Sequence, residues 1–435
     1  MLAGELVSGN PSKWQCQGWC SRVSRLPFAL MMQPTNKAKA VASSRTDDDA
    51  DDASSGEAGG GPVELLPLHL TEKILYRISP LASAHLVAVC KPWAATVSER
   101  LARPVPHLFV YLPADHGSDR RGVVFSVSMH SGYPPEVIPS RVRLADTNGL
   151  GCVGAMPSGR LAFANFCWCE TSVLLVNPIT GARQRIHVEK LRGNPVIAAG
   201  GADSFVSIGI GELMFWRRSG GEEWSKRSVA AGGYPLDAIM SVANCNGRFY
   251  ILDKEGYVFL VDATAPPPLC IEKLPAASLF DRFAPPRSAL VTEYGHLLES
   301  GGEVLFVRRV LASKEDYREI LFCRHGADEL LSIVGFEVYR LDVEGRRWTE
   351  VKELAGDRAL FVSPASSFAV RSSDMEGCRS NCIYFVDKKR YCAQCKRDDG
   401  NTWGVYSMED REVLFKQAVT EQGACSSATW FLPRV

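Results

Sequence analysis

Two patterns of hydrophobic and polar positions divide the chain. From about residue 104 onward, short stretches rich in Val, Phe and Tyr alternate apolar with polar positions and are separated by Gly, Asp and Asn. This period of two predicts β-strands connected by turns. Between about residues 65 and 103 the period is helical instead and predicts two or three short helices. The apolar positions with this spacing are Leu66, Leu70, Ile74, Ile78, Leu86, Val89 and Trp93.

Three prolines mark the limits of these helices. Pro67 stands where the first turn of a helix tolerates proline, and Pro80 forces the residue before it out of the helical conformation. Pro92 is expected at a junction, because a proline inside a helix costs about 3 kcal/mol. Short helices within roughly 40 residues cannot bury a core of their own. We therefore expect their apolar face to cover a partner protein or, alternatively, to cap the β-rich domain.

A two-strand unit recurs in the β-rich part: an aliphatic or aromatic strand, a polar turn and a second strand. Equivalent points at Val173, Leu213, Tyr257, Val338 and Val405 are 40, 44, 81 and 67 residues apart, and we interpret the interval of 81 as two units. A hairpin repeated roughly every 40–50 residues is typical of the blades of a β-propeller. The period predicts about six to eight blades; a pair of β-sandwiches is the alternative.

Charge and composition narrow the classes of function. Lys and Arg together number 49, as do Asp and Glu, so the formal net charge is zero. We therefore expect neither nucleic acid nor a membrane as a partner. Apolar runs are shorter than the roughly 18–20 residues of a membrane-spanning helix, and no secretory signal is evident. We expect the protein in the nucleus or cytoplasm, where its 14 cysteines remain thiols rather than disulfides.

Residues 1–61 differ in composition from the rest and are rich in Ser, Ala, Gly and Asp. Such a segment has too little apolar surface to offset the entropy of ordering it, so we expect a disordered tail. Its first 45 residues contain six basic residues against one acidic residue, Glu5, which is also typical of an organellar transit peptide. A gene-model extension with the natural start at Met31 or Met32 is a further alternative.

Few residues form patterns that carry chemistry. Cys378, Cys382, Cys392 and Cys395 are close enough in sequence to consider a zinc site, but Cys382 opens an apolar strand that suits a buried thiol. We therefore predict no metal. The eight histidines form no metal-binding motif, and the sequence has neither a nucleophile elbow nor a phosphate-binding glycine loop. We predict no catalytic residues, no cofactor and no enzymatic activity.

Two further sets of residues have a structural interpretation. Asp357, between Gly356 and Arg358, is interpreted as holding a blade corner, because an aspartate in a turn binds nearby backbone amides. The alternative is an ion-pair site formed by Asp357 and Arg358. Four tryptophans are interpreted as packing residues of the blades: Trp216, Trp224, Trp348 and Trp403.

Residues 64–97 resemble the F-box, the module through which receptor subunits of cullin-based ubiquitin ligases bind a Skp-family adaptor. The family's closing Leu-x-x-Val-Cys-x-x-Trp signature is matched here, whereas Ser79 and Ser83 depart from the family pattern. The resemblance implies that one set of residues binds the adaptor: Leu66, Pro67, Leu70, Ile74, Leu75, Ile78, Leu86, Val89, Cys90 and Trp93.

The β-rich part resembles the propeller of plant F-box proteins of the KIB type. The segments that match, in the family's order, are 336–342 with Trp348, 356–362 with Ser367 and Phe368, and 381–387. The resemblance implies a mainly β fold, in which a short all-α F-box module precedes a kelch-like β-propeller of six to eight blades. The implied divisions are a tail at 1–61, the F-box at 62–103 and the propeller at 104–435.

Together the two resemblances imply a substrate-recognition subunit of a Skp–cullin–F-box ubiquitin ligase. The F-box would bind the Skp-family adaptor and, through it, the cullin scaffold. The propeller would bind a client protein, whose binding residues the sequence does not identify. Two alternatives stay open: a propeller enzyme or small-ligand binder capped by the helices, and an F-box-like scaffold outside a ligase. The scaffold follows from Ser83, which stands where the family has Leu.

Overall fold

The computed structural model describes a helical segment and the strands of a β-rich domain. The described residues are 67–76, 93, 95–96, 105–111, 121–126, 136–143, 150–164, 172–187, 196–201, 204–209, 212–218, 224–230, 239–265, 269–276, 278–282, 295–313, 331–375, 377–387, 402–419 and 427–433. The chain divides into two units, residues 1–64 and 65–435, and every described residue belongs to the second. The tail predicted for residues 1–61 therefore lies outside the described residues.

Helix α1 (Leu68–Tyr76) starts immediately after Pro67, where proline suits the beginning of a helix. The Pro67 carbonyl accepts hydrogen bonds from the amides of Leu70 at 2.9 Å and Thr71 at 3.1 Å. These two bonds close the first turn, so the predicted start of the helical region is confirmed.

Blades 2 to 5 share one plan, in which the chain runs from the innermost strand outward through four antiparallel strands. Blade 2 consists of β4 (Gly151–Ala155), β5 (Leu161–Ala164), β6 (Ser172–Val176) and β7 (Arg183–His187). Blade 3 consists of β8 (Val196–Gly201), β9 (Ser204–Gly209), β10 (Glu212–Arg218) and β11 (Trp224–Ala230). Blade 4 consists of β12 (Ile239–Cys245), β13 (Arg248–Asp253), β14 (Val258–Asp262) and β15 (Leu269–Lys273). Blade 5 consists of β16 (Gly295–Ser300), β17 (Glu303–Ser313), β18 (Leu331–Asp342) and β19 (Arg347–Val351).

Blade 1 combines two distant parts of the chain. From the inside outward it consists of β25 (Ser427–Phe431), β1 (His107–Tyr111), β2 (Arg121–Ser126) and β3 (Glu136–Arg143). β25 pairs antiparallel with β1, with Ala428 opposite Val110. The last described strand thus completes the first blade.

Blade 6 departs from the common plan. The chain enters it at the second strand, β20 (Arg358–Ser363), and turns inward to β21 (Ser366–Arg371). It then crosses to β22 (Cys382–Asp387), which pairs in parallel with β20. Two strands complete the outer side: β23 (Thr402–Ser407) and β24 (Glu412–Ala418). Short 3-10 helices follow blade 4 and β21: η4 (Leu279–Arg282) and η6 (Ser372–Asp374).

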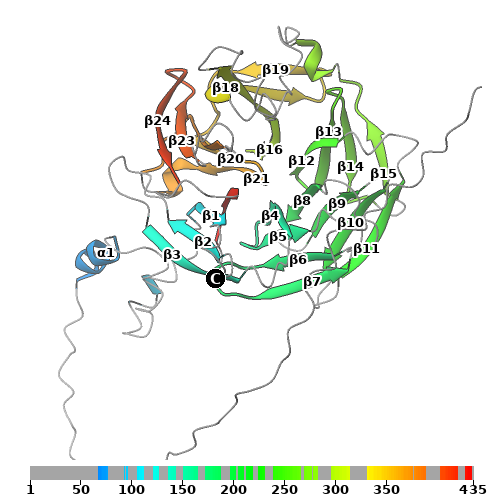
Figure 1. Cartoon of the computed structure of the whole chain (residues 1–435). Helices are drawn as coiled ribbons and strands as arrows, with labels where there is room; N and C mark the ends of the chain where they lie inside the picture. The colour runs from blue at the N-terminus through cyan, green and yellow to red at the C-terminus, as the bar shows by residue number, and fades with distance from the viewer. Residues whose placement is uncertain are drawn as a thin grey trace, which may run out of the picture. The chain divides into compact units, whose positions relative to one another are not determined.

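The blades form a closed β-propeller (Figure 1). Hydrogen bonds join the described strands into five sheets, and the largest sheet contains both blade 3 and blade 4, which a short parallel pairing of β11 with β15 connects. The innermost described strands contact one another in a ring of six, in the order β4, β8, β12, β16, β21 and β25. The propeller therefore has six blades, within the predicted range, and the closed ring excludes the β-sandwich alternative.

Each interface between neighbouring blades contains one hydrophobic cluster. Among the described residues, buried side chains form six clusters, each shared by two successive blades. Aromatic rings meet across four of these interfaces: Phe109 with Phe163, Phe215 with Phe249, Phe336 with Phe385, and Phe361 with Trp430. Because both faces of a blade are covered, strands such as β22 are buried at every position and read as continuous apolar runs.

The tryptophans contribute to this packing as predicted. Trp216, Trp348 and Trp403 are at most 3% exposed, and Trp348 lies edge-on to Phe306 within blade 5. The structure does not describe the side chain of Trp224. The interpretation of the other three as packing residues is confirmed.

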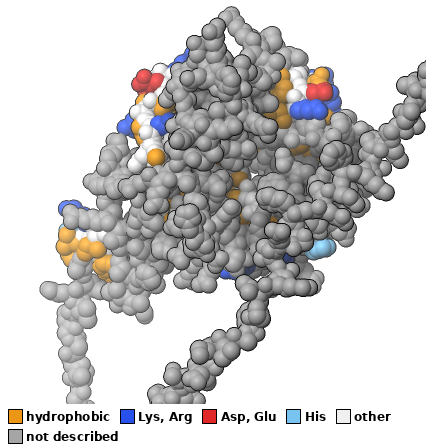
Figure 2. Space-filling model, viewed as in Figure 1, with side chains coloured by type: hydrophobic (Ala, Val, Ile, Leu, Met, Phe, Trp, Pro, Cys, Tyr) orange, Lys and Arg blue, Asp and Glu red, His pale blue; other side chains and the backbone are white. Residues whose placement is uncertain are grey.

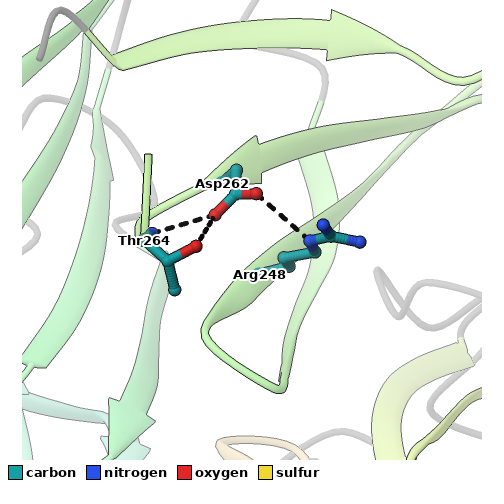
Figure 3. Close-up of polar contacts among 3 residues, drawn as sticks. All are labelled: Arg248, Asp262 and Thr264. Atoms are coloured by element: carbon teal, nitrogen blue, oxygen red, sulfur yellow. Dashed lines mark hydrogen bonds and ion pairs between the residues drawn. The ribbon is translucent and has the colours of Figure 1, made fainter. Parts of the chain in front are cut away.

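Polar side chains shape the turn between the last two strands of a blade. Asp262 at the end of β14 accepts hydrogen bonds from the amide of Thr264 at 2.9 Å and its hydroxyl at 2.5 Å. Its other oxygen pairs with Arg248 at 3.2 Å, across the β13–β14 register (Figure 3). Asn177 and Asp342 accept turn amides at the equivalent positions of blades 2 and 5. These bonds explain the recurring Asn or Asp after an apolar strand.

The repeat seen in the sequence is confirmed in position, but one interval was misinterpreted. The equivalent points, from Val173 to Val405, lie on or directly before the strand next to the outermost one in blades 2 to 6. The interval of 81 residues, from Tyr257 to Val338, spans one blade and not two. It is long because β17 and β18 have 11 and 12 residues and residues 314–330 separate them.

Candidate functional site

Helix α1 presents apolar side chains to solvent. Leu70 is 39% exposed and Ile74 is 42% exposed, and Pro67 is exposed at the start of the helix. Residues three and four positions apart share a face of a helix, so these three side chains form one stripe, which we call the α1 stripe. Figure 2 shows apolar side chains of α1 gathered on the surface.

The described polar side chains of α1 do not cover this stripe. His69 and Lys73 are exposed beside it, whereas Thr71 is only 4% exposed. A surface helix ordinarily turns its apolar face inward and its polar face to water. The described residues contain four large exposed hydrophobic side chains, and two of them, Leu70 and Ile74, lie one turn apart on α1. The α1 stripe is therefore a partly exposed apolar surface.

The other residues predicted to bind an adaptor are described only in part. Trp93 is helical and half-buried, which leaves part of its indole accessible. Leu75 lies in α1, but its side chain is not described. The remaining predicted positions lie outside the described residues: Leu66, Ile78, Leu86, Val89 and Cys90.

The cysteines considered for zinc are partly described. Burial raises the pKa of the Cys378 thiol to about 12 and also raises the pKa of Cys382. Both are therefore protonated thiols near neutral pH. Cys392 and Cys395 lie outside the described residues. In the described part of the chain no three His, Cys, Asp or Glu side chains are grouped to hold a metal.

Asp357 has the structural role that the sequence suggested. Its carboxylate accepts a hydrogen bond from the Ser372 hydroxyl and another from the Ser373 amide at 2.9 Å. Hydrogen bonds from Ser372 and then from Ser373 lower the pKa of Asp357. Asp357 thus ties the start of β20 to η6 at a corner of blade 6, and no ion pair with Arg358 is present among the described residues.

A cavity of about 200 Å³ lies where inner strands of the propeller meet. Five of the six blades contribute residues to its wall: Ala155, Met156, Pro157, Val242, Ala243, Asn244, Leu297, Leu298, Glu299, Ser366, Ser367, Phe368, Ala369 and Leu432. We call it the central cavity. Sequence analysis missed it, because residues far apart in the chain come together only once the order of the blades is known.

The protein is a six-bladed β-propeller, preceded in the sequence by a helix with a partly exposed apolar stripe. Residues 124–407 match the KIB1-4 beta-propeller family, so the chain belongs to that family. This match confirms the predicted resemblance to plant F-box proteins with a KIB-type propeller. Among the described residues, no helix combines the length and hydrophobicity needed to span a membrane.

The curated relatives of the chain carry F-box names. F-box protein At2g26160 of Arabidopsis thaliana is 49% identical over 57 residues, which cover 13% of this chain and 17% of that protein. At1g65770 of Arabidopsis thaliana, which also carries an F-box name, is 28% identical over 197 residues, 44% of this chain and 45% of that one. The chain thus spans less than half the length of these relatives.

Solved structures resemble the chain only weakly. A chain from a nidogen/laminin complex has a TM-score of 0.39 and 10% identity, and the match covers 76% of this chain and all of that one. TolB from Acinetobacter baumannii has a TM-score of 0.38 and 10% identity over 77% of this chain and 69% of its own. Likeness of this degree supports no conclusion about function.

Proposed function

We propose that the chain is the substrate-recognition subunit of a Skp–cullin–F-box ubiquitin ligase. In this role the α1 stripe and Trp93 bind the Skp-family adaptor, and the propeller binds a client protein. The chain itself catalyses no step, because the adaptor and the cullin scaffold bring the ubiquitin-transferring enzymes to the client. The F-box names of the relatives and the KIB1-4 propeller support the proposal.

The observation that carries the proposal is the exposure of Leu70 and Ile74. Full burial of a Leu or Ile side chain contributes roughly 1.5–3 kcal/mol. With 39% and 42% of their surface exposed, each of the two can add about 1 kcal/mol when a partner covers it. Association also costs several kcal/mol in lost freedom. A stable complex therefore needs the further predicted contacts, from Leu86 to Trp93, in addition to the α1 stripe.

Co-purification with a Skp-family adaptor tests the proposal. The full chain should form a stable complex with the co-expressed adaptor, and addition of the cullin scaffold should enlarge that complex in gel filtration. Leu70→Asp and Ile74→Asp, singly and together, place a charge in the apolar contact, which is costly to desolvate. We expect the double variant to retain at most about a tenth of the adaptor, since 1.4 kcal/mol is a factor of ten.

Val343→Asp is the matched control. Val343 is 45% exposed in the turn between β18 and β19, so the substitution adds the same charge at a similarly exposed apolar position. Its adaptor binding should equal that of the unmodified chain. Absence of a complex with the unmodified chain would contradict the proposal. A complex that survives both aspartates on α1 would show that this helix is not the docking surface.

A further inference from the structure

We propose that the central cavity binds a cationic side chain, Lys or Arg, from the client protein. The inference rests on the proposed function, because it identifies the part of the propeller that recognises the client. It extends the proposed function by naming a binding site in the propeller and the chemical group that this site binds.

The size of the central cavity favours a single side chain over a small-molecule ligand. Sites for small molecules and cofactors usually enclose roughly 300–1,000 Å³, whereas this cavity has about 200 Å³. Its wall is mainly apolar, with Met156, Leu297 and Phe368 among its members. A long aliphatic stem with a polar end fits such a wall, because Lys and Arg bury their methylene groups against apolar surface.

The charge of the wall selects a cation. Glu299 is the single ionisable side chain among the residues that line the cavity. Its Oε1 accepts a hydrogen bond from the Gly302 amide at 2.7 Å, which fixes the carboxylate and leaves Oε2 available. Among the described residues no cation forms an ion pair with Glu299, and the Arg358 guanidinium lies instead against Gly301 of the next turn.

Two polar atoms in the wall lack partners. Asn244 Nδ2 and Ser367 Oγ are shielded from water and have no hydrogen-bond partner among the described residues. A buried polar group without a partner costs about 1–3 kcal/mol, so a ligand that supplies a partner recovers that free energy. Both atoms are closed to water, so each side chain must first rotate toward the cavity. The Ser367 hydroxyl can then accept from the cation beside Glu299, and the Asn244 amide can donate to a backbone carbonyl of the client.

The position of the cavity suits a client that approaches the face of the ring. The wall residues lie near the turns that join an innermost strand to its neighbour: Asn244 and Glu299 are the penultimate residues of β12 and β16, Ser366 begins β21, and Met156 follows β4. All four positions line the same cavity, so these turns lie together at one end of the ring. The cavity therefore lies at that end of the ring.

A pair of isosteric peptides tests the inference. Acetyl-Ala-Arg-Ala-amide carries the cation, and acetyl-Ala-citrulline-Ala-amide has almost the same shape without the charge. Ligand-observed NMR titration with the purified full chain measures both dissociation constants up to millimolar concentrations. We expect the arginine peptide to bind about tenfold more tightly, because hydrogen bonds to a charged group are roughly twice as strong as neutral ones.

Glu299→Gln removes the charge and keeps an oxygen that accepts from the Gly302 amide. In this variant the two peptides should bind equally. Glu303→Gln is the matched control, because Glu303 lies four residues further along blade 5, outside the cavity wall, and pairs with Arg340 at 2.9 Å. This control should keep the preference for arginine.

Several outcomes would overturn the inference: no binding of either peptide, equal binding to the unmodified chain, or a preference that survives Glu299→Gln. Adaptor co-purification, measured on the same preparations, separates this result from the proposed function. Adaptor binding without charge discrimination would reject the central cavity alone. Charge discrimination without adaptor binding would reject the proposed function alone.

Discussion

Buried ionisable side chains make the stability of the fold depend on pH. His107 in β1 is only 2% exposed, and its Nδ1 donates a hydrogen bond to the Val105 carbonyl at 2.6 Å. Burial is the main cause that lowers the pKa of His107 to about 4. The imidazole is therefore neutral in the folded protein near pH 7, and its protonation opposes folding.

His107 has different pKa values in the folded and the unfolded chain, and this difference sets how the free energy of unfolding changes with pH. Unfolded His107 has a pKa of about 6.5, so between pH 6.5 and about 4 the unfolded chain binds more protons than the folded one, and stability falls as pH falls. We expect a loss of about 2 kcal/mol between pH 7 and pH 5 from this residue. His107→Asn keeps a donor for Val105 and removes the titration, so urea unfolding should show a smaller loss over this range.

His296 and the turn aspartates do not obscure the difference in pH dependence between the unmodified protein and His107→Asn. Burial also lowers the pKa of His296, to about 3, but this residue contributes equally to both proteins. The Gly345 amide, and then Arg347, lower the pKa of Asp342. Its stabilising effect is therefore present above the usual pKa of an aspartate and is lost only in more acidic solution. An unchanged pH profile in His107→Asn would contradict the assignment.

At the scale of single elements, the hairpin of β12 and β13 depends on its turn. Asn246 and Gly247 have φ values of +54° and +80°, which is the pattern of a type I′ turn. A Cβ atom on Gly247 would lie 2.8 Å from Thr264 Cγ2, on the turn that Asp262 organises. The strain of a side chain at positive φ and the close contact with Thr264 both oppose any larger residue, so the position strongly favours glycine.

Gly247→Ala should therefore lower the free energy of unfolding by about 1–3 kcal/mol. Urea denaturation of the purified chain measures the change. Gly345→Ala is unsuitable as a control, because its Cβ would clash with the Asp342 carboxylate. Gly356→Ala is better: it has a similar φ of +70° and no atom within 4 Å of the added Cβ. An equal loss in both variants would show that the contact with Thr264 contributes nothing.

Strands and helices were predictable from the sequence where a local pattern of residues marks them. Short apolar stretches, some of them followed by a turn residue such as Asn177 or Asp262, identified the strand next to the outermost one in blades 2 to 6. Pro67 likewise marked the start of α1. The interval from Tyr257 to Val338 was misinterpreted, because nothing local distinguishes a second unit from a pair of strands as long as β17 and β18.

Only one part of the candidate site could be predicted from the sequence. The α1 stripe was predictable, because helical spacing places Pro67, Leu70 and Ile74 on one face. The central cavity was not, since Asn244, Glu299 and Ser367 belong to three blades whose order depends on pairings across the whole ring. The inward turn of blade 6, which brings Ser367 to the centre, has no local signature.

At the scale of the whole molecule, the ring depends on the pairing of β25 with β1. Trp430 of β25 is fully buried and contacts Phe361 and Trp403 of blade 6, with ring centroids 5.2 and 6.1 Å apart. The Trp430 amide also donates to the Ser363 hydroxyl at 3.0 Å. A single residue thus joins the first and last blades.

Trp430→Ala should destabilise the propeller by about 3–5 kcal/mol, as truncation of a large buried aromatic does. Trp430→Phe should cost much less, because it keeps most of the packing and removes Nε1, which has no partner among the described residues. Urea unfolding monitored by far-UV circular dichroism distinguishes the two variants. Equal losses would mean that the indole does not fill this interface closely.

The sharing of blade 1 between distant segments has a consequence during synthesis on the ribosome. Val110 and its partner Ala428 are more than 300 residues apart, and at roughly 5–20 residues per second the ribosome takes about 15–60 s to make the chain between them. Throughout that time the free edge of β1 can pair with other nascent chains. The edge of β1 is therefore an aggregation hazard until β25 has emerged from the ribosome.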